Sequence, residues 1–114
     1  MRVNFTQAPR IDGWSLSYMA RNSSADTLAV NSMVDVIQVF SSDPEVKMLQ
    51  ELRHQMPPDD LPPDSTYGNW VDIDASLADG TYSVYVMLDD DGDGPTSRLV
   101  ITVAGGAVTN QTAD

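Results

Sequence analysis

The residues of this chain best suited to chemistry are the aspartates of the stretch LDDDGDG, at positions 88–94. Asp89, Asp91 and Asp93, followed by Gly94, give the pattern D-x-D-x-D-G, in which alternate carboxylates converge on one hard cation and the glycine permits a sharp turn. A complete calcium loop of this kind needs a bidentate glutamate at its twelfth position, which here is Val100. The pattern therefore predicts at most a partial calcium site. The alternative is a long hairpin turn, which favours the same residue types.

Other catalytic groups are scarce. The chain has one histidine, His54, and no cysteine, and it contains no G-x-S-x-G nucleophile motif. Asp72 and Asp74 are paired carboxylates, but the surrounding alternation places them on the solvent face of a strand. We therefore expect no enzymatic activity, and no cofactor apart from the calcium considered above.

The composition is that of a soluble globular domain, with 114 residues, 41% hydrophobic residues and 20% charged residues. The net charge is −11, and all the charged residues between positions 54 and 97 are aspartates. Binding to nucleic acid needs a basic patch that replaces counterions, so we expect no nucleic-acid partner. No apolar run approaches the roughly 20 residues that span a bilayer, so we expect no membrane association.

The elements that must position these residues are strands, because apolar and polar residues alternate through most of the chain. In MVDVIQVF (33–40) both alternating sets are largely apolar, so this segment is expected to be buried on both faces. Short alternating segments separated by turn signals predict an antiparallel β-sandwich or barrel. The predicted strands cover about residues 3–6, 14–20, 28–30, 33–40, 71–75, 81–88 and 98–103.

One segment, SSDPEVKMLQELRHQM (41–56), departs from this alternation. Asp43 suits an N-cap and Pro44 the first helical position. Four apolar residues then recur at helical spacing, namely Val46, Leu49, Leu52 and Met56. The pattern predicts one short helix over about residues 44–54, which either covers an open end of the sandwich or docks on a neighbouring subunit.

The remaining segments are predicted to be irregular. PPDDLPPD (57–64) cannot continue a helix, because proline lacks the amide donor and restricts its neighbour. We therefore expect a single domain over residues 1–104, with the helix and the proline-rich run as an insertion at 41–66. Residues 105–114 are small and polar, and are expected to form a mobile tail.

The stretch LADGTY (77–82) has the form L-x-x-G-x-Y and is followed by an alternating strand, a glycine-bearing loop and a last strand, SRLVITV. Over about residues 69–104 this resembles fibronectin type III and bacterial immunoglobulin-like domains. The resemblance implies an immunoglobulin-like antiparallel β-sandwich of about seven strands. It also implies that the Tyr82 hydroxyl bonds back to the upstream backbone, with Leu77 packed beneath it and Gly80 allowing the close approach. The helix and proline run depart from the family pattern.

The resemblance implies a non-enzymatic structural or binding module, because domains of this family share no catalytic residues and phage capsids and tails carry many of them. Our first hypothesis is a phage capsid decoration or cement protein that binds the major capsid protein, or copies of itself, and stabilises the shell. The first residues lack the apolar run of a signal peptide, so we expect synthesis in the host cytoplasm and a place in the virion. The residues expected to contact the partner are Val36, Val39, Phe40, Leu49 and Leu52.

Two alternatives remain open. The first is an adhesion or carbohydrate-binding module at the cell surface or outside the cell, assisted by calcium, in which Trp70, Tyr67 and Tyr85 form a stacking platform for sugar rings. The second is an acidic inhibitor that mimics DNA through its negative charge.

Overall fold

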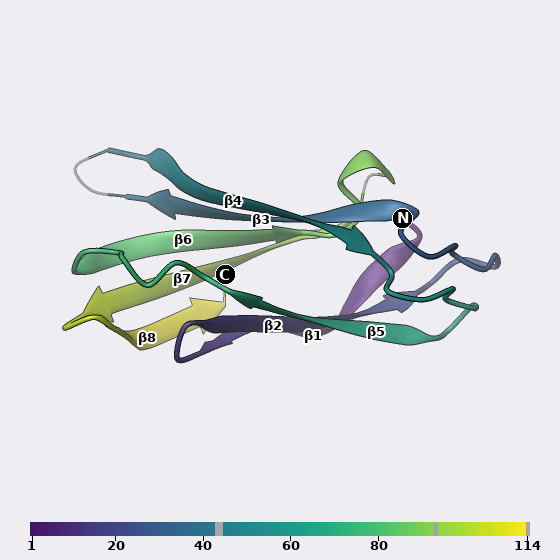
Figure 1. Ribbon diagram of the computed structural model, residues 1–114, viewed down its shortest axis with the longest axis horizontal. Coiled ribbons are helices and arrows are strands. Elements are labelled where there is room, and N and C mark those ends of the chain that lie inside the picture. Colours follow the sequence, from purple (N-terminus) through teal and green to yellow (C-terminus); the bar gives the residue numbers. More distant parts are fainter. Residues whose placement is uncertain (43–44, 93, 114) are drawn as a thin grey trace.

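The protein is an all-β antiparallel sandwich of two facing sheets (Figure 1). The computed structural model describes residues 1–42, 45–92 and 94–113. One sheet has three strands in the order β1-β2-β5, and the other has five in the order β4-β3-β6-β7-β8. The elements are β1 (Val3–Asp12), β2 (Ser15–Asn22), β3 (Met33–Ser41), β4 (Lys47–Met56), β5 (Thr66–Asp72), β6 (Gly80–Met87), the one-turn 3₁₀ helix η1 (Asp90–Gly92), β7 (Thr96–Ala104) and β8 (Ala107–Ala113).

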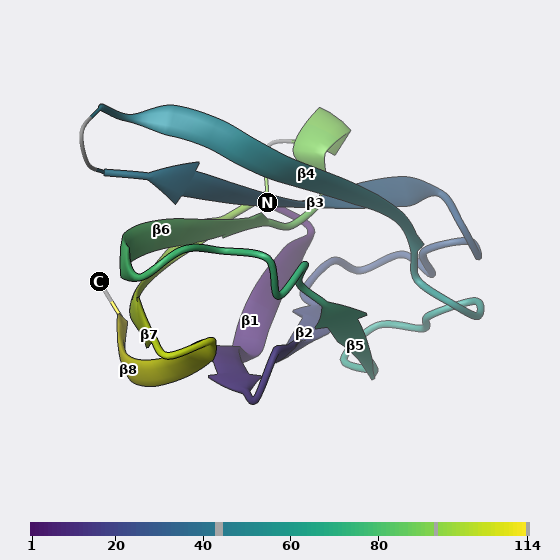
Figure 2. The same cartoon turned by 60° about the vertical axis from the view of Figure 1, so that its left-hand side comes forward.

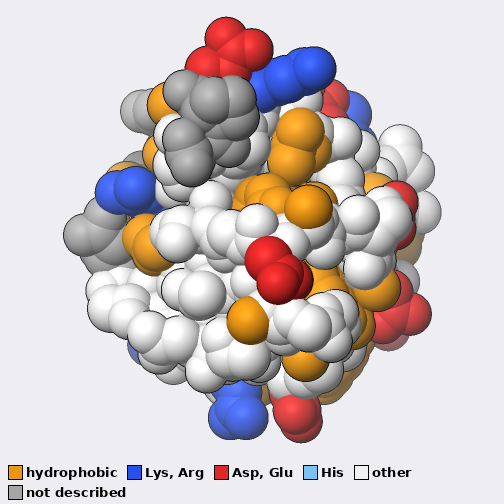
Figure 3. All heavy atoms as spheres, turned by 90° about the vertical axis from the view of Figure 1, so that its left-hand side faces the viewer, with side chains coloured by type: hydrophobic (Ala, Val, Ile, Leu, Met, Phe, Trp, Pro, Cys, Tyr) orange, Lys and Arg blue, Asp and Glu red, His pale blue; other side chains and the backbone are white. Residues whose placement is uncertain are grey.

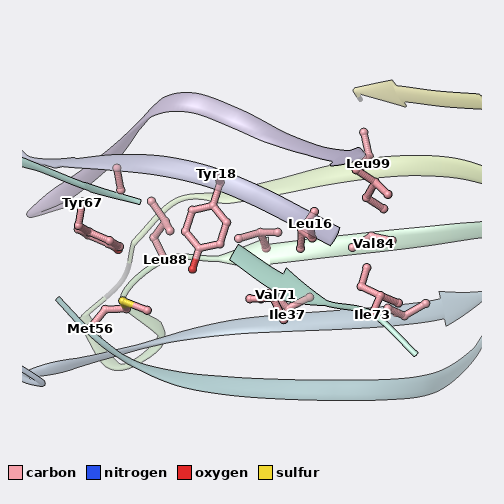
Figure 4. Packing of buried hydrophobic residues seen from close by; sticks show 14 of the residues in the cluster. Leu16, Tyr18, Ile37, Met56, Tyr67, Val71, Ile73, Val84, Leu88 and Leu99 are labelled. Atoms are coloured by element: carbon pink, nitrogen blue, oxygen red, sulfur yellow. The ribbon is translucent and has the colours of Figure 1, made fainter. Parts of the chain in front are cut away.

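The alternation of the sequence creates the core between the sheets. Leu16 and Tyr18 of β2 and Val71 of β5 point toward Ile37 of β3 and Val84 of β6 (Figure 4). Each of these side chains is buried, and burial of apolar area of this kind stabilises a domain by roughly 25 cal/mol per Å². The predicted sandwich is thus confirmed. Among the described residues, no helix has the length and apolarity needed to cross a membrane.

The helix predicted over residues 44–54 is wrong. Residues 47–56 form β4, which pairs antiparallel with β3 along its whole length. Leu52 lies opposite Ile37 and packs against the core. Pairing with β3 supplies β4 with hydrogen bonds and with a partly buried face, and such tertiary pairing outweighs local helix propensity. Asp43 and Pro44, the predicted cap, lie outside the described residues.

The prediction of a mobile tail over residues 105–114 is also wrong for the residues up to 113. Residues 107–113 form β8, which pairs with β7 and curves toward β1 of the opposite sheet (Figure 2). The Gln111 side chain donates to the Ile11 carbonyl oxygen (2.6 Å) and accepts from the Ile11 amide (2.7 Å). A side-chain amide therefore takes the place of a neighbouring strand on the edge of β1 and joins the two sheets.

Two of the predicted strands differ from the structure in extent or position. The segment at 28–30 is not a full strand, because only Leu28 pairs, through an isolated bridge with Leu61 of the proline-rich run. The strand predicted over residues 71–75 lies earlier in the sequence, where β5 covers Thr66–Asp72. Beyond β5, the backbone amide and carbonyl of Asp74 bond to the Gln50 side chain of β4. This second amide bridge ties the connection between β5 and β6 to the edge of the five-stranded sheet.

Candidate functional site

The acidic loop begins with an ion pair whose carboxylate is buried. Asp89 follows β6, is fully buried, and accepts hydrogen bonds from Arg2 Nε (2.6 Å) and Nη2 (2.9 Å) on its two carboxylate oxygens. A β-carbon on Gly94 would collide with the Leu88 carbonyl oxygen, so glycine is required where the loop folds back. The loop is therefore held at its base by a bidentate pair, the strongest common form of ion pair.

The calcium hypothesis for Asp89, Asp91 and Asp93 stays a prediction. Asp93 and the Asp91 side chain lie outside the described part of the structure. Within the described part, no three acidic, histidine or cysteine side chains come together as a metal site. A cation at this loop that used Asp89 would have to displace Arg2 from the same two oxygens.

A second aspartate lies inside the sandwich itself. Asp35 of β3 is 0% exposed, and its Oδ2 accepts hydrogen bonds from the Tyr18 hydroxyl (2.9 Å) and the Tyr67 hydroxyl (2.6 Å). Its Oδ1 accepts from the Asp89 backbone amide (3.0 Å), and Asn69 Nδ2 donates to the Tyr18 hydroxyl (3.0 Å). The network joins both sheets to the base of the acidic loop.

Burial is the main electrostatic influence on this cluster. It raises the pKa of the Asp35 carboxyl above its ordinary value, while hydrogen bonds from Tyr67, the Asp89 amide and Tyr18 hold back part of the rise. Burial, and then the nearby Asp35 charge, raise the pKa of the Tyr18 and Tyr67 hydroxyls. Every buried polar side-chain atom of the described residues has a hydrogen-bond partner, so the cluster acts as a structural connection between the sheets.

The sequence contains a signal for this cluster, although none of the predictions from the sequence included it. Asp35 occupies an inward position of MVDVIQVF, in phase with Met33 and Ile37. A charged residue in phase with a core face is rarely buried without partners. The sequence does not identify those partners, because Tyr18, Tyr67 and Asp89 come from three other segments of the chain.

The Tyr82 hydroxyl bonds back to the upstream backbone, as the family resemblance implies. Tyr82 lies at the start of β6, and its hydroxyl donates to the carbonyl oxygen of Ala78 (2.5 Å). Gly80 has a φ of +156°, and Leu77 packs against the core. Trp14 also packs at the edge of the core, and its indole nitrogen donates to the Gly106 carbonyl oxygen.

The five residues expected to contact a partner are separated by the structure. Val39 is buried in the core and Leu52 packs against it. Val36 lies on the opposite face of β3, beside Met87, and is also buried. On the outside of the sandwich, Phe40 is half-buried and Leu49 is 42% exposed, so these two offer apolar surface to a partner.

A groove lies on the outer face of the five-stranded sheet. The rings of Phe40 and Tyr85 meet edge to face there, with centroids 5.5 Å apart. The groove has a volume of about 310 Å³ and is lined by Gln38, Phe40, Ser41, Ser42, Val46, Ser83, Tyr85, Met87 and Arg98. Close to it along the chain, Met48 and Leu49 are exposed. Hydrophobic atoms are also in view among mostly uncharged ones at the end of the sandwich where β3 leads to β4 (Figure 3).

The three aromatic residues of the predicted sugar platform do not lie together. Tyr67 is buried and donates a hydrogen bond to Asp35. Tyr85 lies on the outer face of the five-stranded sheet. Trp70 is 71% exposed and lies on the outer face of the three-stranded sheet. It borders a hollow of about 210 Å³ that is otherwise lined by Gln7, Arg10, Asp12, Ser15 and Ser17.

Comparison with protein families and curated proteins gives no relative. No protein-family model matches the chain, and a search of curated proteins finds no match. Function must therefore be inferred from the surfaces of the molecule itself.

Proposed function

We propose that the protein is a non-enzymatic binding module that docks on another protein through the groove of Phe40 and Tyr85. The observation that carries this proposal is the apolar lining of a sheet face that has no covering layer within the described structure. An antiparallel sheet with one face packed on the core usually presents polar side chains on the other. Here the second face carries two aromatic rings and Met87.

The composition of the groove is that of an interface centre. Aromatic and methionine side chains are enriched at protein interfaces, where a few of them carry most of the binding energy. The serines, Gln38 and Arg98, which complete the lining, would form the polar rim. The exposed Val46, Met48 and Leu49 would extend the apolar surface along the start of β4.

Two features support the family resemblance within this proposal. The order β1-β2-β5 facing β4-β3-β6-β7 corresponds to immunoglobulin-type sheets in which the first, second and fifth strands oppose the third, sixth and seventh, with an added strand beside the third. The hydrogen bond from Tyr82 to Ala78 is the contact of a tyrosine corner. β8 is an addition to this pattern.

In its most specific form, the proposal makes the protein a decoration or cement protein of a phage capsid. A symmetric shell presents one docking site many times, so a small module gains a large total interface. Stable docking needs about 800 Å² from each partner, which is more than the groove alone and would include the exposed start of β4.

The test begins with the genes that flank this one, because they identify the shell protein to use. Shells assembled from a neighbouring capsid gene are mixed with the purified protein and sedimented. We expect wild type to co-sediment, and Phe40→Asp and Tyr85→Asp to lose at least tenfold in affinity. Trp70→Ser, on the opposite sheet, is the matched control and should bind as wild type does.

Two outcomes would overturn this proposal. If no shell gene lies nearby, or if the shells sediment without the protein, the capsid version fails. If Phe40→Asp and Tyr85→Asp remain folded and still bind, the groove is not the docking surface.

A further inference from the structure

The outer face of the three-stranded sheet carries a second, chemically different surface. Strand register places Trp70 of β5, Ser17 of β2 and Arg10 of β1 in one row across the sheet. The next row is Asp72, Ser15 and Asp12. Two small serines thus lie between a tryptophan on one side and an arginine and an aspartate on the other, which creates the hollow beside Trp70.

The position of Trp70 depends on Gly68. A β-carbon on Gly68 would lie 2.9 Å from Cη2 of the indole ring, so the ring lies over the glycine, two residues back along β5. The side chain nevertheless remains 71% exposed. Tryptophan has the largest apolar surface of any side chain, and leaving it in water forgoes much of the stabilisation that its burial would give.

The rest of the hollow is polar and has hydrogen-bonding capacity to spare. Among the described residues, no hydrogen bond or ion pair engages the side chains of Gln7, Arg10, Asp12, Ser15 or Ser17. Together they offer hydroxyl, amide, guanidinium and carboxylate groups, which act as both donors and acceptors. Both signs of charge are present within one hollow, which favours a neutral ligand with many hydroxyl groups over an ion.

We propose that this hollow binds one ring of a neutral saccharide. A pyranose ring has a C–H face that stacks on an aromatic ring and a rim of hydroxyls that are donors and acceptors. Trp70 would supply the stacking surface, and Ser17, Arg10 and Asp12 would bond to the hydroxyls. A volume of about 210 Å³ is below the range for drug-sized ligands and suits one ring. This site faces away from the groove of Phe40 and Tyr85, so both can be occupied together.

The experiment uses the full chain in two steps. A glycan array and affinity electrophoresis in soluble bacterial polysaccharides first identify the class of sugar. The free monosaccharides glucose, galactose, rhamnose and N-acetylglucosamine are then titrated while tryptophan fluorescence is followed. Trp14→Phe leaves Trp70 as the single tryptophan and isolates its signal, since the chain contains two.

We expect saturable changes in Trp70 fluorescence, with a dissociation constant of about 1 mM for a single ring. Trp70→Ser should abolish binding without loss of stability, because the side chain is largely exposed, and Asp12→Asn and Ser17→Ala should each weaken it severalfold. Gly68→Ala should weaken it by moving the ring. Failure of all sugars and polysaccharides to bind, or binding that Trp70→Ser retains, overturns the proposal. Neither result affects shell co-sedimentation, which tests the other face.

Discussion

At the scale of single residues, the unusual feature is a carboxylate inside the sandwich. Asp35 receives three hydrogen bonds, from two tyrosine hydroxyls and one backbone amide. These donors compensate much of the cost of burying an acid. Burial still raises the pKa of Asp35 above its ordinary value of 3.8, so the folded state holds this proton more tightly than the unfolded state.

This difference gives a defined dependence on pH. As pH rises above 3.8, Asp35 loses its proton in the unfolded chain first, so its contribution to stability falls until the folded-state pKa is passed. We expect the free energy of unfolding of wild type, relative to that of Asp35→Asn, to fall as pH rises above 3.8. Urea unfolding of both proteins at a series of pH values measures the difference between their free energies of unfolding. Taking this difference cancels the contributions of the other titrating groups. A difference that is constant or rises with pH would contradict the raised pKa.

At the scale of elements, the edges of the sheets are joined by side-chain amides. Gln111 of β8 bonds to both backbone groups of Ile11, and Gln50 of β4 does the same at Asp74. Each amide reproduces the donor and acceptor of a peptide group. The backbone groups of Ile11 and Asp74 are thereby satisfied, and at Ile11 this leaves one position fewer for another chain to pair with.

The contact at Ile11 is testable with a neighbouring control. Gln111→Ala removes two partly buried hydrogen bonds, and we expect the free energy of unfolding to fall by about 1–3 kcal/mol. Asn110→Ala, at the adjacent exposed position of β8, should change it by less than about 0.5 kcal/mol. Chemical denaturation measures both. Equal effects of the two substitutions would show that β8 is held to β7 alone.

At the scale of the whole molecule, the net charge of −11 sets the electrostatics. Close packing of so many acids in one domain opposes the compact state through mutual repulsion, and salt screens this repulsion. The melting temperature should therefore rise with sodium chloride, by roughly 3–6 °C for each 1 kcal/mol of stability gained.

Differential scanning fluorimetry from about 0.02 M to about 0.3 M salt covers the range in which screening changes most. The double variant Asp59→Asn, Asp64→Asn removes two charges and should show a shallower rise. A melting temperature that falls with salt in wild type would mean that the attractive pairs, such as Arg2 with Asp89, outweigh the repulsion.

The amino-acid sequence by itself determined the all-β class and the positions of most strands, because a period of two is a property of neighbouring residues. The corner at Tyr82 came from the family resemblance of the stretch LADGTY. The tertiary structure alone decided the state of residues 47–56 and 107–113, because each became a strand through pairing with β3 or β7. The tertiary structure also decided which partners the two buried aspartates bind. Asp89 binds Arg2, which is 87 residues away in the sequence, and Asp35 binds Tyr67, which is 32 residues away. A local sequence pattern does not identify such distant partners. Likewise the Tyr67 side chain is buried and donates to Asp35, whereas the Trp70 side chain is exposed. The two differ because alternate residues of β5 point to opposite faces of the sheet.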